Sequence, residues 1–124
     1  MQYALLFYSP PHTQIPESER ETTIAQMLGE MRVWHEELSR AGVFRTMLRL
    51  APVDAATSLR GEGGKLLVSD GPFAETKEIL GGIAVLECAD LDEALRWARR
   101  CPLVRAGTVE VRPEWGPAAG RAGG

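Results

Sequence analysis

The sequence is poor in the residues that mark several large classes of protein. Its 124 residues include two cysteines, Cys88 and Cys101. Two are too few for a disulfide framework, and their spacing of 13 fits no zinc-binding pattern. Because both lie in apolar patterns, we expect them to be buried, reduced thiols.

Long hydrophobic runs and an excess of basic charge are also missing. No apolar run approaches the roughly 20 residues that a membrane-spanning helix needs. The first residues, MQYALLFY, carry no basic segment and no small-residue cleavage site, so they do not read as a secretory signal. The net charge of −3 gives no basic face for nucleic acid. We predict a cytoplasmic protein that binds neither membranes nor nucleic acid.

The usual catalytic motifs are absent as well. There is no nucleophile motif, no nucleotide fingerprint and no cluster of metal-ligating residues. The string GEGGK at residues 61–65 has the glycines of a phosphate loop, but a strand pattern rather than a helix follows it. We therefore expect no metal and no cofactor.

What is present is the composition of an ordinary globular domain. Hydrophobic residues make up 44% of the chain and charged residues 25%. We predict one domain over residues 1–115 and a flexible tail over residues 116–124, whose glycines and alanines can bury little.

Two segments have the pattern of helices. The first begins at Ser18, which forms a capping box with Glu21, carries an apolar stripe from Ile24 to Leu38, and ends at Gly42. The second begins at Asp90, a capping residue, and ends before Pro102, with its apolar residues on one face.

Strand patterns surround these helices. They cover residues 2–8, 43–50 and 83–88, a hairpin of 56–60 and 65–69 around a glycine-rich turn, and 108–112. The order predicts an α+β fold, a ferredoxin-like β-α-β-β-α-β sandwich with an added hairpin. Two helices cover only one face of a sheet, whereas residues 2–8 and 83–88 are apolar on both sides. We therefore predict a homodimer that packs through the second sheet face.

The segment DGPFAETKE, residues 70–78, concentrates polar chemistry in one loop. Gly71 and Pro72 are turn residues that hold the Asp70 carboxylate in place. Our hypothesis is that Asp70 lies at the rim of a pocket. The alternative is structural: Asp70 caps a turn, Phe73 fills the core, and the other charges are solvated.

A histidine could complete such a site. His35 lies within the apolar stripe of the first helix, where it is either a packed side chain or a general base that pairs with Asp70 across the gap between helix and sheet. In the second case we expect the ligand to be bound by Phe73, Glu75, Thr76 and Lys77.

Three strings carry a family resemblance: DGPFAETKE, then LGGIAVLECADLDEALRWARRCP, then GTVEVRP. Over about residues 1–113 the chain resembles the YCII-related, or DGPF-domain, family. The resemblance implies a dimeric α+β barrel. It also implies either of two functions, because some relatives are proposed enzymes with a His–Asp pair and one branch resembles a dehydrochlorinase of aromatic rings, while other DGPF domains occur beside alternative sigma factors.

Two functional hypotheses follow. The first is a small-molecule enzyme, hydrolase- or lyase-like, with Asp70 and His35 as its acid–base pair and a pocket near residues 70–78. The second is a non-catalytic ligand-binding or regulatory module associated with sigma-factor-type transcription regulation. In the second case Asp70, Glu75 and Lys77 hold the loop together by hydrogen bonds.

Overall fold

The computed structural model describes residues 1–116, so nearly all of the tail predicted at 116–124 lies outside the described residues. In chain order the elements are β1 (Gln2–Ser9), α1 (Glu17–Arg40), β2 (Phe44–Arg49), β3 (Thr57–Glu62), β4 (Lys65–Asp70), β5 (Ile79–Glu87), α2 (Leu91–Arg99) and β6 (Thr108–Pro113). Short 3₁₀ turns at His12–Gln14, Val53–Ala55 and Pro102–Arg105 join them.

Four strands form one antiparallel sheet in the order β2-β5-β1-β6. The central strands β1 and β5 are the two segments with apolar residues on both sides. The order and the two crossing helices are those of a ferredoxin-like fold, which confirms the predicted fold class. The hairpin β3–β4 is a separate two-stranded sheet, inserted between β2 and β5.

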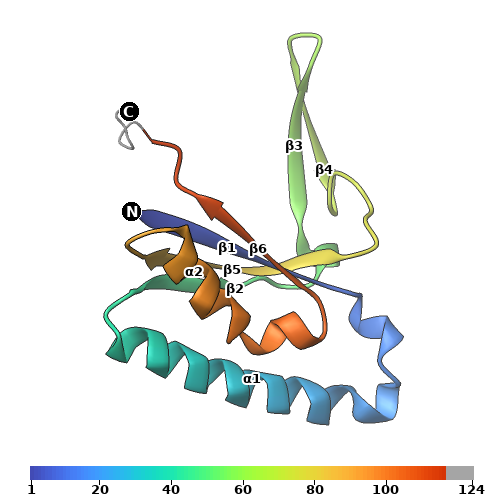
Figure 1. Cartoon of the computed structure of the whole chain (residues 1–124). Coiled ribbons are helices and arrows are strands. Elements are labelled where there is room, and N and C mark those ends of the chain that lie inside the picture. Colours follow the sequence, from blue (N-terminus) through green and yellow to red (C-terminus); the bar gives the residue numbers. More distant parts are fainter. Residues whose placement is uncertain (117–124) are drawn as a thin grey trace.

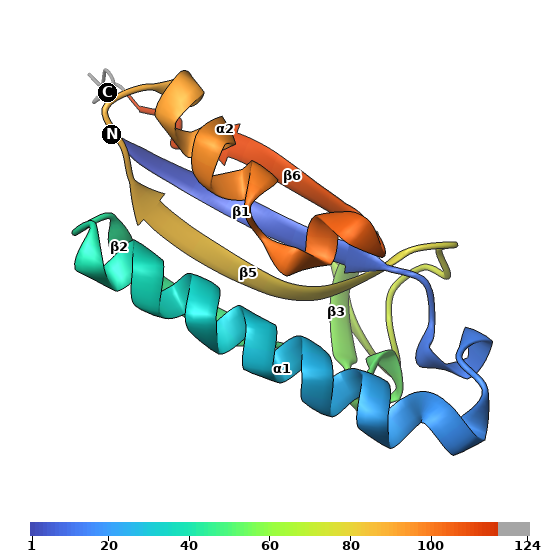
Figure 2. The same ribbon diagram turned by 60° about the horizontal axis from the view of Figure 1, so that its bottom comes forward.

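Both helices cover the same face of the four-stranded sheet (Figures 1 and 2). On that face alternate residues of β1 and β5 are buried, and Trp34 and Leu38 of α1 complete the core between them. Trp34 meets Phe7 edge to face at 6.1 Å between ring centroids, and its indole Nε1 donates to the Trp97 carbonyl at 3.1 Å. No helix among residues 1–116 is both long and apolar enough to cross a membrane.

Among residues 1–116 no helix lies on the other sheet face, which is called the open face here. Its central positions are apolar: Leu6 lies beside Ile83, and Ala4 lies beside Val85. On the two edge strands, Leu48 of β2 is 55% exposed, and Glu110 of β6 lies beside Leu6. The central strands are thus apolar on both faces, as predicted, and the two helices of the chain cover one of these faces.

The start of α1 differs from the prediction. The helix begins at Glu17, one residue earlier than expected, with Pro16 as its N-cap and no side-chain capping hydrogen bond. The capping box of Ser18 and Glu21 is therefore wrong. The Pro16 carbonyl accepts from the Glu19 N–H at 2.8 Å, so the backbone itself closes the first turn and Ser18 falls inside the helix.

The other helix ends follow the prediction. The Asp90 carboxylate accepts from the Glu93 N–H at 2.9 Å, and the Glu93 carboxylate accepts from the Ala89 N–H at 2.7 Å. After α1, Gly42 has a φ of +78°, the left-handed conformation expected of a residue that stops a helix.

The hairpin β3–β4, residues 57–70, projects from the rest of the molecule and is called the arm here. Figure 1 shows it rising on the open-face side, opposite the helices. Gly63 and Gly64 form its two-residue turn between the paired residues Glu62 and Lys65. Both glycines have positive φ, +59° and +80°, which a tight turn of type I′ requires.

Candidate functional site

A cavity, called the apolar cavity here, lies where α1 parts from the sheet. Burial along the helix decreases toward its N-terminus: Leu38 and Trp34 are buried, Met31 is half-buried and Leu28 is 43% exposed. The cavity has a volume of about 870 Å³. Its walls come from Ile24, Met27, Leu28 and Met31 of α1, from the ends of β1 and β2 (Phe7, Tyr8, Ser9, Met47, Leu48, Arg49), from residues 50–54 and from the start of β5.

This size and composition suit a small, mainly apolar molecule, since typical ligand pockets hold about 300–1,000 Å³. Three methionines in the wall, Met27, Met31 and Met47, are side chains that adapt to irregular shapes. A few polar groups face the same space, among them Ser9, Arg49 and Asp54. Such isolated polar groups in an apolar wall orient a ligand.

A second cavity of about 520 Å³, called the loop cavity here, lies beside the DGPF segment. Val53, Asp54 and Ile79 line both cavities, so the two adjoin. Three carboxylates line the loop cavity, those of Asp54, Asp70 and Glu75, and its lining includes no lysine or arginine. Its electrostatics therefore favour a ligand group that donates hydrogen bonds, such as a hydroxyl, over an anion.

The loop is held at the base of the arm by short-range hydrogen bonds. Gly71 follows the last residue of β4 with a φ of +92°, which a glycine tolerates best. Its N–H donates to the Ala56 carbonyl at 2.7 Å, and its own carbonyl accepts from the Ser58 hydroxyl at 2.8 Å. Further along, the Thr76 hydroxyl donates to the Glu78 carbonyl. These bonds fix the direction of the chain on both sides of Asp70.

The structure brings some of the predicted site residues together. Asp70, Glu75 and Thr76 all line the loop cavity. Phe73 and Lys77 line neither cavity, and both are exposed. Phe73 is 88% exposed, so it does not fill the core of this chain.

His35 lies elsewhere. Its ring packs edge to face on Phe44 at 4.3 Å between centroids, and its Nε2 lies 3.5 Å from the Ser39 hydroxyl. It lines neither cavity. The C-terminal half of α1, to which it belongs, lies at the far end of the helix from the arm (Figures 1 and 2). Within residues 1–116 the structure therefore does not bring His35 and Asp70 together.

Sequence reasoning did not select Asp54 or Arg49, which line the apolar cavity. Asp54 lies in the short turn Val53–Ala55, directly after Pro52. A carboxylate in a turn that begins with proline and follows a strand is the sequence signal that could have identified Asp54. Arg49 is the last residue of β2 and lines the cavity, and nothing in its local sequence distinguishes it from other strand arginines.

Metal-ligating and thiol chemistry are not assembled in this part of the chain. Among residues 1–116, no three side chains of His, Cys, Asp or Glu are grouped closely enough to hold a metal ion. Cys88 and Cys101 are free and buried, as predicted. Burial raises the pKa of the Cys101 thiol to about 11 and raises that of Cys88 as well, so both stay protonated at neutral pH.

Comparison with known proteins places the chain in a family. The model of the YCII-related domain matches residues 1–115. An uncharacterised protein of Rhizobium meliloti (strain 1021) is 37% identical over 115 residues, which are 91% of either chain. A solved structure of 5-chloro-2-hydroxyhydroquinone dehydrochlorinase from Burkholderia phenoliruptrix AC1100, in complex with 2,5-dihydroxybenzoquinone, covers 96% of this chain at 11% identity and a TM-score of 0.49. That likeness is too weak to transfer an activity. The family match and the bacterial relative both span nearly the whole chain, and the chain belongs to the YCII-related domain family.

Proposed function

We propose that this protein binds a small, mainly apolar molecule with a hydroxyl group and performs hydrolase- or lyase-like acid–base chemistry on it. The supporting observation is the pair of adjoining cavities. The apolar cavity accepts the body of the ligand, and the carboxylate-lined loop cavity accepts its polar end. A phenol has this division into an apolar ring and a hydrogen-bond donor.

In this proposal Asp70 is the proton acceptor. An ionised carboxylate within hydrogen-bond reach of a hydroxyl can take its proton as the reaction proceeds and return it afterwards. Glu75 and Thr76 line the same space and would orient the polar end. Asp54, at the junction of the two cavities, is the second carboxylate available for this step. His35 has no part in the proposal, because it lines neither cavity.

Binding of catechol, compared with benzoate, tests the first half of the proposal. We expect catechol to bind and benzoate to bind at least tenfold more weakly, because the loop cavity carries three carboxylates. The Leu28→Trp variant fills the apolar cavity and should weaken catechol binding at least tenfold. Its control is Val33→Trp on the same helix, where Val33 is 53% exposed and lines neither cavity. Equal binding by both variants and the wild type in calorimetry would contradict the site.

Turnover tests the second half. Hydrolysis of 4-hydroxyphenyl acetate, which carries both a hydroxyl group and an ester, should exceed the buffer rate. The excess should fall by about 10²-fold or more in Asp70→Asn, the range that general acid–base groups contribute. Asp92→Asn is the matched control, because Asp92 is an exposed carboxylate of α2 outside both cavities.

A ligand-binding or regulatory module is the second candidate. The observation that favours it is that His35 lines neither cavity, so the carboxylates of the loop cavity have no histidine, lysine or arginine among the residues that line it. Catechol binding with no Asp70-dependent turnover would select this reading over the enzyme.

The protein would act as a homodimer. The open face carries Leu6, Ile83 and Val85 at its centre, half-buried although no helix covers them. A second copy with the same face is the simplest cover, because a two-fold contact needs only one self-complementary surface. The homodimer proposal rests on the apolar pattern of the central strands and on the open face, which no helix of residues 1–116 covers.

A further inference from the structure

The two faces of the arm differ in chemistry. Cross-strand partners share a face, so the register Leu59↔Val68 and Gly61↔Leu66 places Leu59, Leu66 and Val68 together. The opposite face holds the pairs Ser58↔Ser69, Arg60↔Leu67 and Glu62↔Lys65. The first face is apolar apart from the pair Thr57↔Asp70 at the base of the arm, and the second is mainly polar. This is the pattern of a sheet with one side packed on a protein surface.

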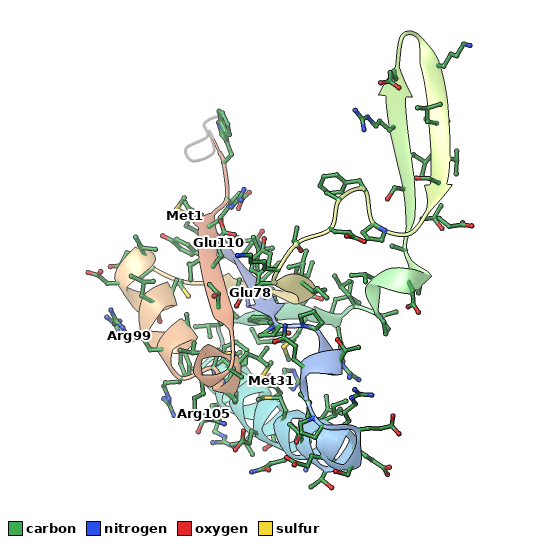
Figure 3. All side chains as sticks on the ribbon, turned by 90° about the vertical axis from the view of Figure 1, so that its right-hand side faces the viewer. Met1, Met31, Glu78, Arg99, Arg105 and Glu110 are labelled. Atoms are coloured by element: carbon green, nitrogen blue, oxygen red, sulfur yellow. The ribbon has the colours of Figure 1, made fainter. Side chains whose placement is uncertain are left out.

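Nothing in the described part of the chain covers the apolar face of the arm. Leu59 is 64% exposed, Leu66 66% and Val68 62%. In the part of the chain that the structure describes, β3 and β4 pair only with each other. Figure 3 shows the arm standing away from the other elements, with its side chains in open space. An isolated two-stranded hairpin is at best marginally stable in water, so the arm is expected to pack on another surface.

The position of the arm identifies that surface. The arm rises on the open-face side of the sheet (Figure 1), so a second copy seated on the open face would lie beside the arm. Sheets that pack face to face lie about 10 Å apart, whereas six-residue strands extend about 20 Å. An arm of this length is long enough to reach past the sheet of a second copy seated on the open face.

We propose that the arm of each copy clasps the other copy of a homodimer, with Leu59, Leu66 and Val68 packed on the partner. This inference rests on the homodimer proposed above and adds a second, reciprocal contact to it. The occupant is a second copy because one chain carries both surfaces, and a two-fold axis brings each arm to the partner.

The clasp would also set the geometry of the loop cavity. Asp70 is the last residue of β4. The hydrogen bonds that Gly71 accepts from the Ser58 hydroxyl and donates to the Ala56 carbonyl tie it to the base of the arm. Fixing the arm on a partner therefore fixes the start of the DGPF loop. Phe73, which is 88% exposed in the single chain, is close enough in sequence to be covered by the same contact.

Two leucine substitutions on opposite faces of the arm test the clasp. Leu66→Glu puts a charge on the apolar face, and Leu67→Glu puts the same charge on the other face, one residue away. In sedimentation of the full chain over a range of concentrations, we expect wild type and Leu67→Glu to dimerise alike. Leu66→Glu should weaken dimerisation at least tenfold, as expected for a charge placed in an interface core.

Hydrogen exchange of the wild type supplies a readout that needs no variant. Amides of residues 57–70 should become protected as the concentration rises through the dimerisation range, and lose protection on dilution. Equal dimerisation of both variants with the wild type, or exchange that is independent of concentration, would overturn the clasp. A wild type that stays monomeric would overturn it too, and would direct the arm to a different protein. Catechol binding is measured separately, so failure of the clasp does not decide the ligand proposal.

Discussion

The molecule contains two apolar surfaces built from similar residues in opposite situations. Between the helices and the sheet, Leu5 of β1 and Leu38 of α1 are 0% exposed and belong to a core that the chain closes by itself. On the arm, Leu59 and Leu66 are 64% and 66% exposed. Both sets follow a regular secondary-structure pattern. The difference shows that an apolar pattern identifies a surface to be covered, whereas only the fold shows whether the chain covers it.

The largest effect is expected from the closed core. Trp34→Ala removes the largest fully buried side chain, its edge contact with Phe7 and the hydrogen bond to the Trp97 carbonyl. We expect a loss of about 3–5 kcal/mol in the free energy of unfolding, a large part of the roughly 5–15 kcal/mol that holds a domain together. Denaturant titration measures it. Val33→Ala, at a neighbouring position that is 53% exposed, should change the value by less than about 0.5 kcal/mol. Similar losses for the two variants would contradict the orientation of α1.

A smaller, pH-dependent effect comes from the thiol in the same core. Burial raises the pKa of Cys101 from its ordinary value to about 11. The unfolded chain therefore releases this proton first, so stability is complete below about pH 9 and falls as the pH rises toward 11. A shift of this size corresponds to roughly 2–3 kcal/mol. Unfolding free energies measured from pH 8 to pH 11 should fall less steeply in Cys101→Ala than in the wild type; identical slopes would contradict the burial of the thiol.

Much of the fold could be predicted because it depends on periodic patterns. The two-sided apolar runs became the central strands β1 and β5, and the alternation of strands and helices along the chain indicated the ferredoxin-like fold. The second helix began at Asp90 as its capping chemistry indicates. The first did not begin at Ser18, because a backbone bond to the Pro16 carbonyl closes the first turn in place of a side chain.

The candidate site could be predicted only where it is local. Asp70, Glu75 and Thr76 lie in one loop, and they line one cavity. The predicted pairing of His35 with Asp70 required the loop to lie beside the C-terminal half of α1. Helical spacing shows which face of the helix a residue is on, but not which part of the helix lies next to the loop. Asp54 and Arg49 join the apolar cavity through the path of the chain after β2, which also leaves no mark in the sequence pattern.

The smallest effect should come from the arm of a single chain, and it gives the sharpest contrast with the core. Leu59→Ala removes a side chain that is 64% exposed, so in solutions dilute enough for monomers the free energy of unfolding should change by less than about 0.5 kcal/mol. In concentrated solutions the same change should lower the melting temperature, because a partner that binds only the folded chain adds to its stability. Trp34→Ala should destabilise the protein equally at both concentrations, since its contacts lie within one chain. If Leu59→Ala also proved independent of concentration, the arm would contribute nothing to association, and its apolar face would have to be covered by another molecule.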